Sequence, residues 1–251
     1  PILAAGGELF IPNEIVSKDI FKLSNWIMEN KISNALLMTS VAETIWSFNI
    51  NLPYLKCLMI AGERCKNFPP KDTKYRVLNV YGSAEAAVVT ISELKPNIGG
   101  VVPTIGKPVK GVGLHVVDNH GNKVEFGESG ELVITGKTLS KGYLNNIEAT
   151  NEVFKENTLD DLSDKQYFTK DRAMVDADGN FIILGRMDSL VKIRGNRVDL
   201  LELESTVTEI PEVRKAACVF DDSDEQFLHL IVESDVEDSK KDNIKTVSYT
   251  H

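Results

Sequence analysis

Cysteine and histidine are scarce in this chain, and neither forms a recognisable catalytic or metal-binding pattern. The 251 residues include three cysteines, Cys57, Cys65 and Cys218, which are odd in number and far apart. Their spacing does not match a disulfide framework or a zinc site, so they fit a reducing cytoplasm. The four histidines lie in unrelated contexts, and the sequence pairs none of them with a nucleophile.

Positive charge and long apolar runs are also in short supply. Lys and Arg number 28 against 37 Asp and Glu, for a net charge of −9. This balance argues against nucleic acid as the main partner, because phosphate backbones are bound by basic surfaces. Any anionic substrate must therefore meet local basic residues or a metal ion. Apolar runs are too short to span a bilayer and no basic flank precedes one, so we expect neither a signal peptide nor a membrane anchor.

Apolar periodicity in the first hundred residues predicts an α/β layer. Short apolar runs typical of buried strands occupy residues 34–38, 55–60 and 75–80. We predict one helix capped by Ser17 and a second opened by a capping box from Ser40 to Glu43. Alternating strands and helices indicate parallel strands, whose carboxyl ends commonly line ligand sites. Gly62 and Tyr81 are both expected at those ends.

Beyond Pro96, polar and apolar residues alternate, which predicts antiparallel strands. The turn residues 176–180 predict a hairpin, and a second hairpin tip is expected at 194–196. A helix over 200–210 and two further strands complete a small α/β module that begins near Asp188. The Gly-Lys-Thr at the end of 130–138 is not interpreted as a phosphate loop, because strand-forming residues fill the segment.

The chain is organised around residues 80–85, where a strand rich in β-branched residues meets Tyr81, Gly82, two small residues and Glu85. One interpretation is a tight turn between two strands. The other is a ligand site, because an aromatic face can accept a base, glycine allows close approach of the backbone, and a carboxylate can hold a cation. The hexapeptide alone does not decide between them.

Motifs in fixed order along the chain resemble those of the adenylate-forming superfamily, specifically the amino-acid adenylation domains of nonribosomal peptide synthetases. The matching segments are 81–85, 105–108, 130–136, 141–144, 167–171 and 185–195, with Thr150 and Phe154. The resemblance implies a large mixed α/β subdomain with a distorted β-barrel region over residues 1–187. It also implies the start of a small α+β subdomain over 188–251, with Asp188 as the hinge.

The resemblance implies a nucleotide site. Tyr81 would stack on adenine, Asn79 and the Val80 backbone would bond its amino edge, and Gly62 and Glu63 would approach its other face. Asp171 would accept hydrogen bonds from the ribose hydroxyls, to which Arg186 would also donate. Glu85 would hold magnesium, and Lys192 is expected with Glu85 among the catalytic residues.

The implied reaction joins a carboxylate to ATP, giving an acyl-adenylate and pyrophosphate. The acyl group then passes to the phosphopantetheine thiol of a carrier domain, so peptidyl carrier and condensation domains are the expected partners. The residues expected to meet the substrate side chain are all apolar: Leu36, Met59, Ala61, Val80, Val88 and Val89. Such a site would leave a buried charge unpaired, so an apolar amino acid is expected, although each residue also suits an ordinary strand core.

Three positions depart from the family pattern. Ala84 stands where the family usually has a threonine, Lys170 replaces the usual glycine, and Ile183 replaces a frequent aromatic residue. By the same matching, the phosphate loop and the aspartate that binds a substrate amino group would precede Pro1, and the catalytic lysine of the small subdomain would follow His251. We therefore expect a segment of an adenylation domain that is inactive by itself.

Alternative interpretations stay open. One is a non-catalytic or degenerate adenylation-like scaffold, favoured by Ala84 and Lys170. Another is a domain that activates a keto, aryl or fatty acid, with its small subdomain interrupted or truncated. Glu85, Asp171 and Arg186 favour an enzyme, because a scaffold needs no ligands for magnesium or ribose.

Overall fold

The computed structural model describes residues 2–96, 102–187, 190–193, 196–211, 213–221 and 227–234. The chain divides into two compact units, 1–185 and 186–251. The predicted hinge, Asp188, lies outside the described residues.

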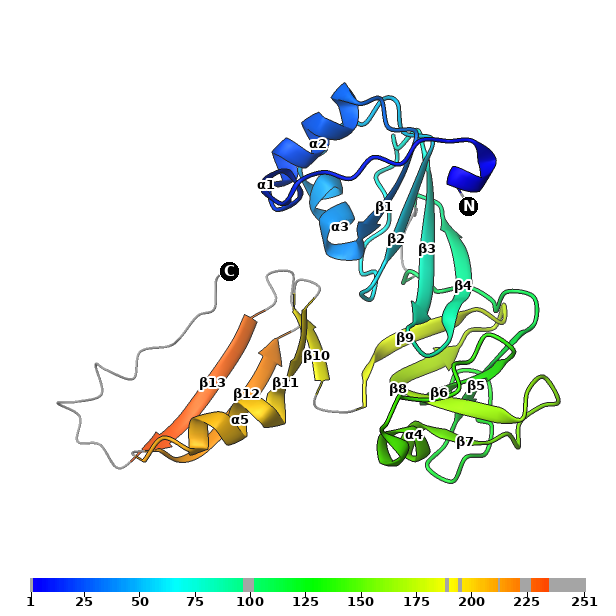
Figure 1. Cartoon of the computed structure of the whole chain (residues 1–251), viewed down its shortest axis with the longest axis vertical. Coiled ribbons are helices and arrows are strands. Elements are labelled where there is room, and N and C mark those ends of the chain that lie inside the picture. The colour runs from blue at the N-terminus through cyan, green and yellow to red at the C-terminus, as the bar shows by residue number, and fades with distance from the viewer. Residues whose placement is uncertain are drawn as a thin grey trace. The chain divides into compact units, whose positions relative to one another are not determined.

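The first sheet contains the predicted parallel strands. Its order is β1 (Asn34–Met38), β2 (Cys57–Ala61), β3 (Arg76–Ser83) and β4 (Ala87–Leu94) (Figure 1). Strands β1, β2 and β3 are parallel, as predicted, whereas β4 runs antiparallel to β3. The segment that follows β3 is therefore the tip of a hairpin.

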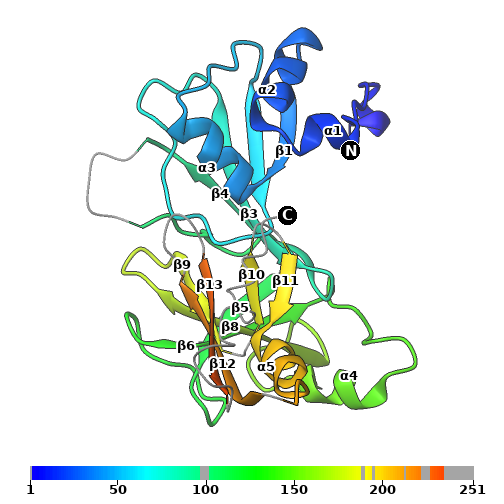
Figure 2. The same ribbon diagram turned by 90° about the vertical axis from the view of Figure 1, so that its left-hand side faces the viewer.

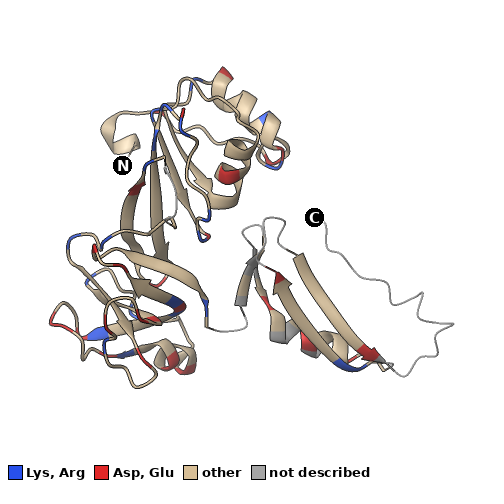
Figure 3. Ribbon diagram, turned by 180° about the vertical axis from the view of Figure 1, so that it is seen from behind, with Lys and Arg blue, Asp and Glu red and all other residues tan. Residues whose placement is uncertain are grey.

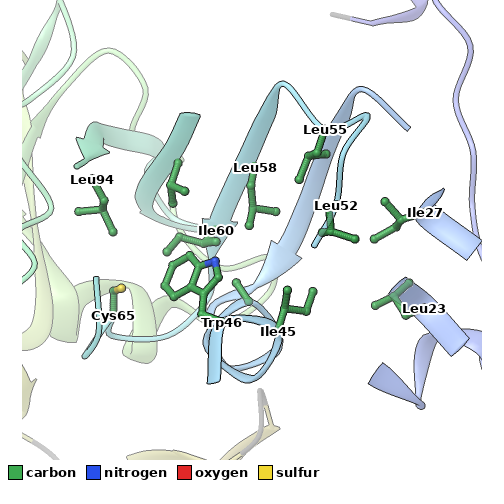
Figure 4. Packing of buried hydrophobic residues seen from close by; sticks show 12 residues of the cluster. Leu23, Ile27, Ile45, Trp46, Leu52, Leu55, Leu58, Ile60, Cys65 and Leu94 are labelled. Atoms are coloured by element: carbon green, nitrogen blue, oxygen red, sulfur yellow. The ribbon is translucent and has the colours of Figure 1, made fainter. Parts of the chain in front are cut away.

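Helices cover one face of this sheet (Figure 1). They are α1 (Glu14–Ser17), α2 (Ile20–Glu29) and α3 (Thr39–Ser47), preceded by a short 3-10 turn, Leu3–Ala5. Leu58 and Ile60 of β2 are fully buried and belong with Ile45 and Trp46 of α3 to the first core (Figure 4). Burial of such side chains contributes about 1.5–3 kcal/mol each.

Both predicted helix caps are wrong. Ser17 ends α1, and α2 is capped by Asp19, whose carboxylate accepts hydrogen bonds from the backbone N–H groups of Phe21 and Lys22. Helix α3 begins after Met38, which makes no side-chain cap. Glu43 instead accepts two backbone N–H bonds of 2.7 Å from the 66–67 loop. Asp19 thus satisfies free N–H groups at the start of its own helix, whereas Glu43 satisfies N–H groups of a loop that is distant in sequence.

The second sheet is antiparallel, as predicted. Its strands are β5 (Val112–Val117), β6 (Ser129–Gly136), β7 (Phe154–Glu156), β8 (Lys165–Val175) and β9 (Phe181–Arg186), in the order β5-β6-β8-β7 with β9 also paired to β8. Helix α4 (Ile147–Val153) precedes β7. The segment 130–136 lies within β6, so it is a strand and not a phosphate loop.

The β3–β4 hairpin belongs to both cores of the first unit. Val77 and Leu94, at its open end, lie in the first core. Ala86 and Val89, near its tip, lie in the second core with side chains of the second sheet such as Leu132. The hairpin tip is therefore held against the second sheet by burial of apolar side chains.

The second unit contains the predicted small module. Strands β10 (Leu190–Ile193) and β11 (Asn196–Asp199) form an antiparallel pair, and β12 (Val213–Asp221) pairs antiparallel with β13 (Phe227–Ser234). Helix α5 (Leu200–Thr208) packs beside β12 (Figure 2). The predicted tip residues Arg194 and Gly195 lie outside the described residues.

Basic and acidic residues are interspersed along the described parts of the chain (Figure 3). Among the described residues, no helix is long and apolar enough to cross a membrane.

A polar cluster fastens the 157–163 loop to the second sheet. Asp160 Oδ2 lies 2.7 Å from His115 Nε2 and accepts a 2.6 Å hydrogen bond from Thr135 Oγ1. Burial alone would raise the pKa of Asp160, but these bonds and those from Asn157 and the Leu162 N–H hold it well below its usual range. Burial lowers the pKa of His115, and its bond to Asp160 offsets this only partly.

Both shifts have the same consequence for stability. Each folded pKa lies below the ordinary value, 6.5 for His115 and 3.8 for Asp160, so the unfolded chain binds more protons as the pH falls through these values. We expect the free energy of unfolding to fall first below pH 6.5 and again below pH 3.8. In Asp160→Asn the decrease in the free energy of unfolding below pH 3.8 should be smaller, because this variant lacks the carboxylate. Urea unfolding across pH measures this; an unchanged second loss would contradict the role of Asp160.

Candidate functional site

The tip of the β3–β4 hairpin is a tight turn between two strands, the first of the two interpretations of residues 80–85. The second interpretation, a ligand site, stays a prediction. Strand β3 continues through Ser83, and the turn 84–86 leads into β4 with a register shift between Tyr81 and Gly82. A Cβ on Gly82 would lie 2.0 Å from the Ala87 carbonyl oxygen. Only glycine therefore allows this close approach of the two strands, and the turn displays Ala84 and Glu85.

The tip brings together two predicted nucleotide-binding residues. The Tyr81 hydroxyl donates a 2.5 Å hydrogen bond to Asp171 Oδ2 on β8. The Asp171 N–H donates to Thr169 Oγ1 at 3.0 Å, and that hydroxyl donates to the Leu132 carbonyl at 2.8 Å. Burial, and then the Asp171 carboxylate, raise the pKa of Tyr81 well above its usual value, so the phenol stays a neutral donor that orients the carboxylate.

The carboxyl end of β2 supplies Gly62 and Glu63. Gly62 has a φ of +96°, and a Cβ there would lie 2.7 Å from Met38 Cε. The Glu63 carbonyl accepts from Thr39 Oγ1 at 3.2 Å, and its Oε2 accepts from the Ser40 N–H at 3.2 Å. These bonds fix the segment after β2 to the start of α3. The buried Glu63 Oε1 has no hydrogen-bond partner among the described residues.

Asn79 is buried on β3, and its Nδ2 donates to the Thr104 carbonyl at 3.0 Å. Its neighbour Val80 is paired with Ile91 of β4. The predicted role of Asn79 and of the Val80 backbone toward adenine stays a prediction.

The predicted substrate residues fall into two groups. Leu36, Met59, Ala61 and Val80 alternate along their strands with buried or partly buried side chains such as Leu37, Leu58 and Asn79. Leu36, which is exposed, is the register partner of Met59. Because side chains alternate between the faces of a sheet, these four share the face opposite the helices. Val88 is exposed on β4, whereas Val89 is fully buried in the second core.

The second unit contains the remaining predicted residues. Arg186 ends β9, and Lys192 lies on β10. Their predicted roles, and that of Asp188, stay predictions.

Lys170 occupies a backbone conformation that suits glycine. Its φ is +61°, in the left-handed region where a side chain costs about 1–2 kcal/mol. The Lys170 N–H donates to Glu131 Oε1 at 2.9 Å, and its ammonium lies 3.3 Å from Glu152 Oε1. The ion pair is solvent-exposed and contributes little, so the strain dominates.

We expect Lys170→Gly to raise the free energy of unfolding by about 1 kcal/mol, because the strain at positive φ is relieved. Lys170→Ala is the matched control, since it removes the same ion pair but keeps a Cβ. Urea unfolding of both variants measures the difference; equal stabilities would contradict strain at this position.

Glu85 is bound by residues 140–143, a segment for which no functional role was predicted. Its carbonyl accepts from the Ser140 N–H at 2.7 Å, and its Oε1 accepts from the Tyr143 hydroxyl at 2.7 Å. The contact joins residues far apart in the chain, so spacing alone could not reveal it.

The residues present fit a magnesium ion that arrives with a nucleotide. The described residues contain no group of three side chains able to hold a metal by themselves. Magnesium bound to nucleotides, however, usually takes one or two protein carboxylates together with phosphates and water. The carboxylate of Glu85, at the partly exposed tip, matches that donor set.

Comparison with known proteins shows the family of this chain. The family described as AMP-binding enzyme matches residues 1–144. Bacitracin synthase 1 of Bacillus licheniformis is 31% identical over 219 residues, which are 87% of this chain and 4% of that protein. Tyrocidine synthase 2 of Brevibacillus parabrevis is 33% identical over 225 residues, which are 88% of this chain and 6% of that protein. The chain therefore spans only a small part of these relatives.

Two solved structures share the fold. The Vibrio cholerae adenylation domain AlmE, in complex with glycyl-adenosine-5'-phosphate, has a TM-score of 0.76 at 24% identity, covering 94% of this chain and 47% of that one. NpsA-ThdA, an artificially fused adenylation-PCP di-domain from Klebsiella oxytoca, has a TM-score of 0.71 at 21% identity, covering 92% and 43%. The chain belongs to the AMP-binding enzyme family, in which it is a fragment of the adenylation-domain type found in nonribosomal peptide synthetases.

Proposed function

We propose that this chain is part of an enzyme that uses ATP to activate the carboxylate of an apolar amino acid and then loads the acyl group onto a carrier-domain thiol. The contact of Tyr81 with Asp171 carries this proposal, because it joins the residues matched to base and ribose binding. In the first step a substrate carboxylate oxygen attacks the α-phosphorus, and the bond to the β-phosphate oxygen breaks to release pyrophosphate. In the second the phosphopantetheine sulfur attacks the acyl carbon, and AMP leaves.

The residues of this chain would act by binding and positioning. The Tyr81 ring would pack on adenine while its hydroxyl orients Asp171, whose carboxylate would accept the ribose hydroxyls. Glu85 would hold magnesium, which offsets phosphate charge. Positioning and charge stabilisation of this kind suffice for reactions at phosphorus, so no protein nucleophile is required.

The apolar character of the sheet face shared by Leu36, Met59, Ala61 and Val80 supports an apolar substrate. A carrier domain and a condensation domain are the proposed partners, and the cytoplasm is the proposed location because phosphopantetheine thiols must stay reduced.

Exchange of labelled pyrophosphate into ATP by the full-length synthetase tests the proposal. A panel of amino, keto and aryl acids should give exchange with apolar amino acids and little with charged ones. Exchange with none of the acids would overturn the enzymatic function. Exchange strongest with charged acids would overturn the apolar pocket alone.

A degenerate scaffold is the second candidate, because the exposed Ala84 offers no hydroxyl to a phosphate. A hydrogen bond to a charged group contributes about 1.5–3 kcal/mol. If the enzyme is active, Ala84→Thr should therefore raise the exchange rate about tenfold or more. Ala84→Val is the control of similar shape without the hydroxyl; an equal gain in both variants would contradict a hydrogen bond to phosphate.

A further inference from the structure

The Tyr143 phenol contacts the carboxylate assigned above to magnesium. Its hydroxyl donates to Glu85 Oε1 at 2.7 Å, across 58 residues of sequence. The same segment also holds the Glu85 backbone, since the Ser140 N–H donates to the Glu85 carbonyl at 2.7 Å. Glu85 is therefore fixed at both its main chain and its side chain by residues 140–143.

Residues outside the β3–β4 hairpin hold Tyr143 in place. Its N–H donates to Thr150 Oγ1 at 2.8 Å, and that hydroxyl donates to the Asn146 carbonyl at 2.8 Å. The Tyr143 ring packs edge-to-face on Phe154, with ring centres 6.1 Å apart and planes at 71°. A Cβ on Gly142 would lie 2.4 Å from Thr150 Cγ2, so the chain approaches α4 closely. Helix α4 and the start of β7 thus determine where the phenol hydroxyl lies.

A fixed donor restricts a flexible carboxylate. An unrestrained glutamate loses side-chain entropy when it is ordered, and the hydrogen bond from Tyr143 imposes part of this loss before the metal binds. Hydrogen-bond partners of metal-binding carboxylates typically change metal affinity by about 10–100-fold. Because Tyr143 is 39% exposed, its hydrogen bond contributes little to folding, and its effect should appear in metal binding.

We propose that Tyr143 is a positioning residue that orients the Glu85 carboxylate toward the magnesium ion of bound MgATP. This inference rests on the proposed function, in which Glu85 is the magnesium ligand.

The test is a magnesium titration of nucleotide binding by the full-length synthetase, with a fluorescent ATP analogue as the probe. Tyr143→Phe removes only the hydroxyl and keeps the packing on Phe154. Its half-saturating magnesium concentration should rise about tenfold, while nucleotide affinity at saturating magnesium returns to the wild-type value. The exposed Tyr54 supplies the matched control, and Tyr54→Phe should leave the titration unchanged. Thr150→Val, which removes the anchor of the Tyr143 backbone, should shift the titration in the same direction.

Electron paramagnetic resonance of Mn²⁺ bound with ATP gives a second readout that is independent of turnover. Glu85→Gln distinguishes the role of Tyr143 in positioning from the role of Glu85 as magnesium ligand. If Glu85→Gln shifts the magnesium midpoint and Tyr143→Phe and Thr150→Val do not, the role of Tyr143 is overturned and the proposed magnesium ligand stands. If Glu85→Gln leaves the midpoint unchanged, Glu85 is not the ligand, and both assignments fail.

Discussion

Gly82→Ala is expected to open the tip of the β3–β4 hairpin and to abolish nucleotide binding. The added Cβ would lie 2.0 Å from the Ala87 carbonyl oxygen and 3.1 Å from Val88 Cα. These are backbone atoms, so a side-chain rotation cannot relieve the clash and the strands must separate. Overpacking typically costs about 1–3 kcal/mol, and we expect the upper end here. Because Ala86 and Val89 hold the tip in the second core, the displacement would reach Tyr81.

Gly121→Ala is the matched control. Gly121 has a φ of +82° and open space around its Cβ position, so this variant should lose only about 1 kcal/mol from backbone strain and keep nucleotide affinity. Thermal unfolding and nucleotide binding measured on both variants give the comparison. Full nucleotide affinity in Gly82→Ala would show that the tip tolerates a side chain and would contradict the close approach of Gly82 to the Ala87 carbonyl.

Asp171→Ala is expected to weaken ATP binding by the full-length synthetase at least about a hundredfold. The carboxylate would accept two hydrogen bonds from the ribose, and each bond to a charged group contributes about 1.5–3 kcal/mol. The change also leaves the Tyr81 hydroxyl, which now donates to Asp171 at 2.5 Å, without that acceptor. Isothermal titration with ATP measures the loss.

Asp171→Asn controls for the loss of the side chain. Asparagine keeps an oxygen for Tyr81, so the fold should be preserved while ribose binding weakens by a smaller factor. If the folded Asp171→Ala protein bound ATP with wild-type affinity, this would contradict the proposed role of Asp171 in ribose binding.

Local patterns predicted much of the fold, because local interactions specify those elements. The 176–180 turn is an example: Asp176 Oδ1 accepts from the N–H groups of Asp178 and Asn180, all within the turn itself. The parallel strands were predictable for a similar reason, since short continuous apolar runs are typical of buried strands.

The caps could not be predicted in the same way, because several acceptors lay within reach. Ser17 and Asp19 are both good capping residues, and the chain uses Asp19 for α2. Glu43 had the spacing of a capping box, yet its carboxylate binds the 66–67 loop. Competition between local and distant donors is decided by tertiary structure, which spacing does not reveal.

The candidate site depends on contacts between distant residues. Tyr81 and Asp171 are 90 residues apart, and no periodicity connects them; the resemblance to a family alone suggested that they act together. The positive φ of Lys170 was indicated only by the resemblance, in which glycine usually occupies this position, because lysine itself carries no sign of such a backbone conformation. Glu85 was a candidate from the start, whereas its partner Tyr143 becomes visible only in the structure.

Photolabelling of the full-length synthetase with 8-azido-ATP tests the location of the nucleotide site most directly. The tryptic peptide 77–110 contains Tyr81 and Glu85, and the peptide 57–64 contains Gly62 and Glu63. The proposed site predicts that these two peptides carry the label and that unlabelled ATP displaces it. Displaceable labelling confined to other peptides of the synthetase would contradict a nucleotide site at the β3–β4 hairpin.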